Sequence, residues 1–223
     1  MGDVAVATEV RRRVLASHDR FWTLDDFVGS VHAVSKALSR LVTAGDLRRI
    51  RRGLYWRGTP TLLGLAPPPA DRLAHAVVDS PGVGPAGFSA ALRLGLSTQV
   101  PRRDTVAIPI RVPRNPGPLT YVSRAGAVKR RDEKLRPEEV ALLEVLRDWK
   151  TYIEVPSTVA VERISNLADT GALRVERLAR ASATEPAAVR DRLRRLLTDI
   201  GHADAAAIVR PARRGAPGDS KAA

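Results

Sequence analysis

The chain has 223 residues, of which 44% are hydrophobic and only 4% aromatic, so its core must be built mainly from Leu, Val and Ala. The absence of cysteine excludes disulfides and thiol chemistry, and no apolar run is long enough to cross a membrane. The net charge of +13, from 37 Lys and Arg against 24 Asp and Glu, attracts polyanions, of which nucleic acid is the commonest.

The first predicted elements are two helices separated by an aromatic pair. Residues 4–17 carry apolar side chains close to every fourth position, which predicts a helix. Phe21 and Trp22 follow, and we expect their side chains to be buried in the core. Thr23 is a suitable N-cap for a short second helix that ends at Gly29.

A third helix is predicted over residues 31–44, capped by Ser30 and ended by Gly45. Its apolar face contains Val34, Leu38 and Leu41, spaced four and three residues apart. The opposite face carries hydroxyl, imidazole and cationic groups, the types that bind base edges and phosphates. These residues are His32, Ser35, Lys36, Ser39, Arg40 and Thr43.

Alternating apolar and basic residues from 46 to 58, around a turn at Gly53, predict a β-hairpin with arginines on its exposed face and tip. Three helices and a basic hairpin predict a winged helix-turn-helix over residues 1–58, with the third helix in the major groove of DNA. We expect the hairpin to bind phosphates or the minor groove; the alternative is an edge hairpin with solubilising charges. Its candidate DNA-binding residues are Arg48, Arg49, Arg51, Arg52 and Arg57.

The remainder of the chain is predicted to be a second, mostly helical domain with small strands. Residues 59–70 contain four prolines and predict a stiff linker. Within the second domain, 71–200, helices are expected at 70–78 and 88–96, from Pro137 onwards, and at 157–169, 172–181 and 186–200. Short strands are expected at 104–110 and 119–123, and residues 201–223 are expected to fray. The fold class is therefore mainly α with small β elements (α+β).

The positive charge is concentrated before this helical part. Residues 1–60 hold 11 basic and 6 acidic side chains, residues 61–130 hold 9 and 3, and the remainder hold 17 and 15. Arginine outnumbers lysine and suits DNA, although a GC-rich coding sequence is an alternative explanation of that preference. A second basic stretch could contact DNA flanks, a toxin or the toxin's substrate, or could be a solvated surface, and the sequence does not rank these options. It comprises Arg102, Arg103, Arg111, Arg114, Arg124, Lys129, Arg130 and Arg131.

Two segments of the chain resemble a known family. The stretch from Leu38 to Gly45, with Arg49 and the Gly53–Tyr55 turn, is similar to the N-terminal winged-helix domain of AbiEi-type antitoxins. Residues 88–101 (FSAALRLGLSTQVP) look like the start of that family's second domain, in which a small-residue helix runs into a Gly-Leu-Thr-Thr-Gln-like element. Ser97 stands here where Thr is common, and Leu94 where His is often seen. The resemblance extends over residues 1–200.

This resemblance implies a regulator of a type IV, abortive-infection toxin–antitoxin system. The N-terminal domain would bind inverted repeats of double-stranded DNA in its own promoter and repress the operon. The C-terminal domain would counteract a nucleotidyltransferase-like toxin encoded next to it, without requiring stable contact with that toxin. The expected protein is cytoplasmic and needs no cofactor or metal.

Three other functions compete with this interpretation. An enzyme is disfavoured because there is no phosphate-binding loop or His-Glu-x-x-His motif, the histidines are scattered, and Gly87–Ala91 lacks the final Gly of a nucleophile elbow. A plain winged-helix repressor without a toxin partner remains open. An RNA-binding protein would need exposed aromatic platforms, for which only Tyr55, Trp56 and Tyr121 are available.

Overall fold

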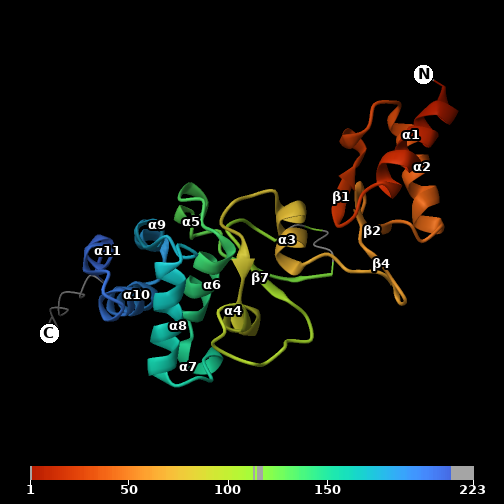
Figure 1. Cartoon of the computed structure of the whole chain (residues 1–223). Coiled ribbons are helices and arrows are strands. Elements are labelled where there is room, and N and C mark those ends of the chain that lie inside the picture. Colours follow the sequence, from red (N-terminus) through yellow and green to blue (C-terminus); the bar gives the residue numbers. More distant parts are fainter. Residues whose placement is uncertain (1, 113, 115–117, 212–223) are drawn as a thin grey trace, which may run out of the picture. The chain divides into compact units, whose positions relative to one another are not determined.

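The structure is a computed structural model that describes residues 2–112, 114 and 118–211. The chain forms two compact units, one made mainly of residues up to Val77 and the other mainly of residues from Val78 onwards (Figure 1). Helices predominate and the sheets are small, so the architecture is mixed α+β, as predicted. Among the described residues, no helix combines the length and hydropathy needed to span a bilayer.

The N-terminal unit begins with two helices that pack against each other and a three-stranded sheet. The helices are α1 (Asp3–Leu15) and α2 (Val31–Thr43), with a single 3-10 turn, η1 (Leu24–Asp26), between them. The strands β1 (Arg20–Thr23), β2 (Arg48–Arg51) and β3 (Leu54–Arg57) form an antiparallel sheet in the order β1-β3-β2. Their core contains Val6, Val10, Val14, Trp22, Phe27, Ala33, Val34, Ala37, Leu38, Leu41, Leu47 and Tyr55.

The segment between α1 and α2 differs from the prediction. Phe21 and Trp22 lie in strand β1, where they pair with Trp56 and Tyr55 of β3; Trp22 is buried in the core, as expected, whereas Phe21 is half-buried against Trp56. The expected second helix is only the single turn η1: the Asp26 carboxylate accepts hydrogen bonds from the backbone N–H and hydroxyl of Thr23, at 2.6 and 2.9 Å, and the backbone is already extended at Phe27. Val28, just after the turn, is exposed, so no apolar face there would be buried by a longer helix.

Much of the proline-rich stretch has regular structure. Strands β4 (Pro60–Thr61) and β5 (Gly64–Leu65) form a small hairpin, and helix α3 (Ala70–Val78) follows. The Trp56 indole N–H donates to the carbonyl of Ala66 at 2.7 Å and fixes the end of the hairpin against β3. Only residues 66–69 lie between the hairpin and α3.

The second unit combines another three-stranded sheet with a cluster of helices. Its strands are β6 (Gly84–Pro85), β7 (Thr105–Ile108) and β8 (Thr120–Ser123), with β7 antiparallel to β6 and parallel to β8. Its helices are α4 (Gly87–Arg93), α5 (Lys129–Asp132), α6 (Pro137–Val145), α7 (Trp149–Tyr152), α8 (Ser157–Asp169), α9 (Val175–Ala181), η2 (Ser182–Thr184), α10 (Ala187–Asp199) and α11 (Ala203–Ile208).

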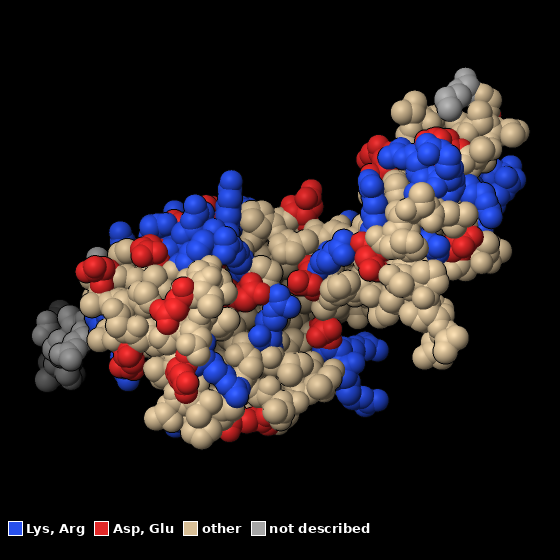
Figure 2. Space-filling model, viewed as in Figure 1, with Lys and Arg blue, Asp and Glu red and all other residues tan. Residues whose placement is uncertain are grey.

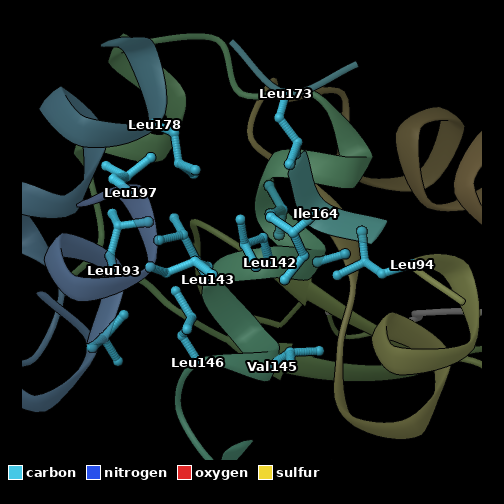
Figure 3. Close-up of a cluster of buried hydrophobic side chains, with 14 of the residues drawn as sticks. Leu94, Leu142, Leu143, Val145, Leu146, Ile164, Leu173, Leu178, Leu193 and Leu197 are labelled. Atoms are coloured by element: carbon cyan, nitrogen blue, oxygen red, sulfur yellow. The ribbon is translucent and has the colours of Figure 1, made fainter. Parts of the chain in front are cut away.

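Helix α6 lies at the centre of this unit, and all its residues from Glu139 to Val145 are buried. Figure 3 shows Leu142, Leu143 and Leu146 within a core to which α9 and α10 also contribute leucines. A helix without an exposed face must be covered on all sides, which explains why its apolar residues show no helical stripe.

The long helices and both predicted strands of this part are confirmed, whereas short elements were missed. Strand β6 and helices α5, α7 and α11 were not predicted. The segment expected to fray begins with α11, whose Ala205 and Ala206 are buried in the core together with Val209. Residues 212–223, at the end of the expected tail, lie outside the described residues.

Candidate nucleic-acid interface

Helix α2 is fixed at both ends by the residues that predicted it. The Ser30 hydroxyl accepts a hydrogen bond from the Ala33 N–H at 3.2 Å, and Gly45 takes a positive φ of 78° after the last turn. Between these ends, the apolar face is buried in the core of the N-terminal unit. The opposite face is therefore held rigidly towards solvent.

All six predicted residues of α2 lie on this solvent face. Five are exposed and Ser35 is half-buried, at a spacing that repeats every three or four residues. The Thr43 hydroxyl donates to the Ser39 carbonyl at 3.2 Å, which fixes its rotamer. Lys36 and Arg40 form no ion pair with any residue that the structure describes, so their charges remain available to a ligand.

The β2–β3 hairpin presents a second group of cations. Arg48, Arg49 and Arg52 are exposed and Arg51 is half-buried. Gly53, with φ of 78°, provides the left-handed conformation of the turn, and the register shifts between Arg49 and Arg51. Such an irregularity increases strand twist, so the arginines point in several directions around the strand and its turn.

Arg57 does not belong to this group, contrary to the prediction. Its side chain is 9% exposed, and Nη1 donates to the Asp46 carbonyl at 2.9 Å and lies 3.9 Å from the Asp46 carboxylate. The prediction assumed a two-stranded hairpin with one face exposed to solvent. Because β1 adds a third strand, β3 is the central strand and all its residues are buried.

Tyr55 and Trp56, the sheet aromatics considered as stacking platforms for bases, are buried. Trp56 is fully buried, with Phe21 at 4.6 Å between ring centroids and the Arg72 guanidinium 5.4 Å from its ring. Tyr55 is part of the core. Tyr121, in the second unit, is half-buried. This arrangement weakens the case for stacking-based RNA recognition.

The second basic stretch is divided between surface and interior. Arg102, Arg103 and Arg111 are exposed, whereas Arg130 is fully buried. The Arg130 guanidinium donates to Glu185 at 2.6 Å and to Glu144 at 2.7 Å. The position of Arg130 next to Lys129 and Arg131 suggested surface charge, but its partners lie up to 55 residues away and leave no local signal.

Arginines neutralise the buried carboxylates of α6. Burial by itself favours the neutral form of Glu144, but the hydrogen bonds from Arg124 and the charge of Arg130 outweigh it and keep the pKa of Glu144 below its usual value. Glu139 accepts from the Arg136 N–H, and from the backbone and side chain of Arg174, all within 3.0 Å. These arginines stabilise the fold and are not free to bind a ligand.

Within the described residues, no cluster of three or more His, Cys, Asp or Glu side chains is placed to hold a metal ion. Exposed cations occur in both units: Arg102, Arg103 and Arg111 belong to the second unit, and those of α1, α2 and the β2–β3 hairpin to the N-terminal unit. Figure 2 shows Lys and Arg gathered over the region that carries α1 and α2 in Figure 1.

Comparisons with known proteins add a partial match. No curated protein matches the chain. A crystal structure of the RV2827C protein from Mycobacterium tuberculosis is similar, with 19% sequence identity, a TM-score of 0.46, and coverage of 92% of this chain and 79% of that one. Residues 13–109, less than half of the chain, match the model of DUF6088, a family of unknown function.

Proposed function

We propose that the N-terminal unit is a winged helix-turn-helix that binds double-stranded DNA with sequence preference. In this motif a helix–strand–helix segment precedes a recognition helix and a two-stranded wing. Here α1, β1, η1, α2, β2 and β3 would take those places in chain order, with η1 as a shortened second helix. The observation that carries the proposal is the solvent face of α2, which holds unpaired polar groups beside a hairpin of exposed arginines.

In this proposal α2 enters the major groove, where its hydroxyl and imidazole groups discriminate base pairs by their hydrogen-bonding edges. The β2–β3 hairpin lies along the backbone or in the minor groove, and its arginines bind phosphates. The wing residues would be Arg48, Arg49, Arg51 and Arg52; Arg57 is excluded by its burial.

We further propose that the DNA is the protein's own promoter and that the protein acts in the cytoplasm as an antitoxin. This step rests on the resemblance to AbiEi-type antitoxins in residues 38–55 and 88–101. The second unit would counteract a nucleotidyltransferase-like toxin. A plain repressor with the same DNA-binding unit and no toxin is the alternative.

Footprinting of the DNA upstream of the gene tests the DNA-binding part. We expect the full chain to protect repeated half-sites separated by about one helical turn, roughly 10 bp, or a multiple of it. Uniform, unspecific coverage of the fragment would contradict a sequence-specific repressor.

Co-expression tests the antitoxin part separately. If a nucleotidyltransferase-like gene lies beside this one, its expression alone should arrest growth, and co-expression of the full chain should restore it. Growth arrest that persists, with footprinting intact, would favour the plain repressor.

A further inference from the structure

We propose that the groove between α1 and α2 binds a backbone phosphate of DNA, and that Arg11 of α1 forms this site together with Lys36 and Arg40 of α2. The inference rests on the proposed DNA binding and extends it in two ways. It adds a residue of α1 to the interface, and it assigns Lys36 and Arg40 to the phosphate backbone instead of the bases.

The groove is an open depression of about 490 Å³ formed by two helix faces. Helix α1 contributes residues spaced three and four apart, and α2 contributes Lys36 and Arg40 together with three apolar residues. Small side chains at Ala7, Ala33 and Ala37 leave the space empty. The lining residues are Asp3, Val4, Ala7, Thr8 and Arg11 of α1 and Ala33, Lys36, Ala37, Arg40 and Leu41 of α2.

The groove separates the polar residues of α2 into two sets. Lys36 and Arg40, one turn apart, line it. His32, Ser39 and Thr43 do not line it; they lie on the part of α2 turned furthest from the buried face. A base edge in the major groove meets this outer part first. The flank that faces α1 is better placed for the sugar–phosphate backbone at the edge of the groove.

The charges in the groove favour an anion. Arg11, Lys36 and Arg40 are exposed, and none of them forms an ion pair with a residue that the structure describes. A single acidic side chain, Asp3, lines the groove with them. A phosphate group accepts two parallel hydrogen bonds from an arginine, and a lysine adds a point charge. Three cations therefore converge on a space large enough for one phosphate.

The neighbouring Arg12 provides a matched control. It lies on the same helix and is exposed, but its guanidinium binds the Glu9 carboxylate at 2.7 Å and does not line the groove. Replacement of either arginine removes one positive charge from α1. Only replacement of Arg11 removes a proposed phosphate contact.

The test is the affinity of the full chain for its upstream DNA and for scrambled DNA over a range of salt concentrations. We expect Arg11→Ala and Arg40→Ala to weaken binding to both DNAs by the same factor and to reduce the salt slope by about 0.9 each. Arg12→Ala should leave the slope unchanged. Asp3→Asn, which removes the acid from the groove, should strengthen binding to both DNAs.

Two results would overturn the inference while leaving the proposed function intact. One is an Arg11→Ala protein that binds like Arg12→Ala. The other is an Arg40→Ala protein that loses the preference for native DNA at an unchanged slope, since that result identifies a base contact. If the wild-type chain binds neither DNA, the proposed function and this inference both fail. Equal melting temperatures of the variants would show that folding is not the cause.

Discussion

Arginine has two distinct roles in this chain, and burial separates them. Arg57 and Arg130 are enclosed by carbonyl and carboxylate oxygens, and they hold together segments that are distant in sequence. Arg48, Arg49 and Arg52 reach solvent. Replacing a buried arginine of the first kind should lower the stability of the fold, whereas replacing an exposed arginine of the second kind should weaken ligand binding. Variants at these positions should therefore change different measured quantities.

Arg57→Ala should lower the free energy of unfolding by about 1.5–3 kcal/mol, the range for a hydrogen bond to a charged group. The Asp46 carbonyl would lose its charged donor within the N-terminal unit. Urea denaturation followed by tryptophan fluorescence measures the change. Arg52→Ala, at the exposed turn, is the control and should stay within about 0.5 kcal/mol of wild type. Equal stability of the two variants would contradict the structural role of Arg57.

The double variant Arg51→Ala/Arg52→Ala should reduce affinity for native and scrambled DNA alike. If each arginine binds one phosphate, the salt slope should fall by about 1.8 in total. Titrations at several salt concentrations give this slope. A loss confined to native DNA would instead place the hairpin among the base-reading elements.

Among the elements, α2 could be predicted most completely from sequence. Its cap at Ser30, its end at Gly45 and its polar face are encoded within about 15 neighbouring residues, and local signals of this kind survive folding. Strand β1 could not be predicted, because Arg20 pairs with Arg57 across a long stretch of chain. The same long-range pairing buries Arg57. The groove residue Arg11 was missed because its neighbours on α2 are brought to it only by helix packing.

Ser30→Ala should destabilise the N-terminal unit by about 1 kcal/mol, since the Ala33 N–H loses its side-chain acceptor. Ser30→Gly should lower the free energy of unfolding by only about a few tenths of a kcal/mol. Thermal and urea unfolding of the three proteins should give decreasing stability in the order wild type, Gly variant, Ala variant. An Ala variant as stable as wild type would show that the cap contributes nothing to α2.

Helix α6 should make the second unit sensitive to acid. The pKa of Glu144 is below its usual value of 4.5 in the folded protein, so its ionised form stabilises the fold. This contribution is fully present above pH 4.5 and is lost as the pH falls through the lowered folded-state pKa. Glu154, whose pKa is also lowered by the Ser97 hydroxyl and the Thr98 N–H, acts in the same direction. Urea unfolding between pH 7 and pH 3 should show the decline, and a constant free energy would contradict it.

At the scale of the whole molecule, positive charge is used differently by the two units. In the second unit Arg124, Arg130, Arg147 and Arg174 are paired with buried glutamates, whereas Arg102, Arg103 and Arg111 are exposed. In the N-terminal unit the cations of α2 and of the hairpin face solvent. The net charge of +13 therefore does not locate a polyanion site by itself; the structure identifies which arginines are paired with buried glutamates and which face solvent.

The central claim is that this chain binds DNA with sequence preference through its N-terminal unit. The most direct test is fluorescence anisotropy of the full chain with its upstream DNA and with scrambled DNA, each at two salt concentrations. We predict tighter binding to the native sequence and a steep loss of affinity for both DNAs at the higher salt. Weak binding that is equal for the two DNAs would contradict the claim and direct attention to RNA or protein partners.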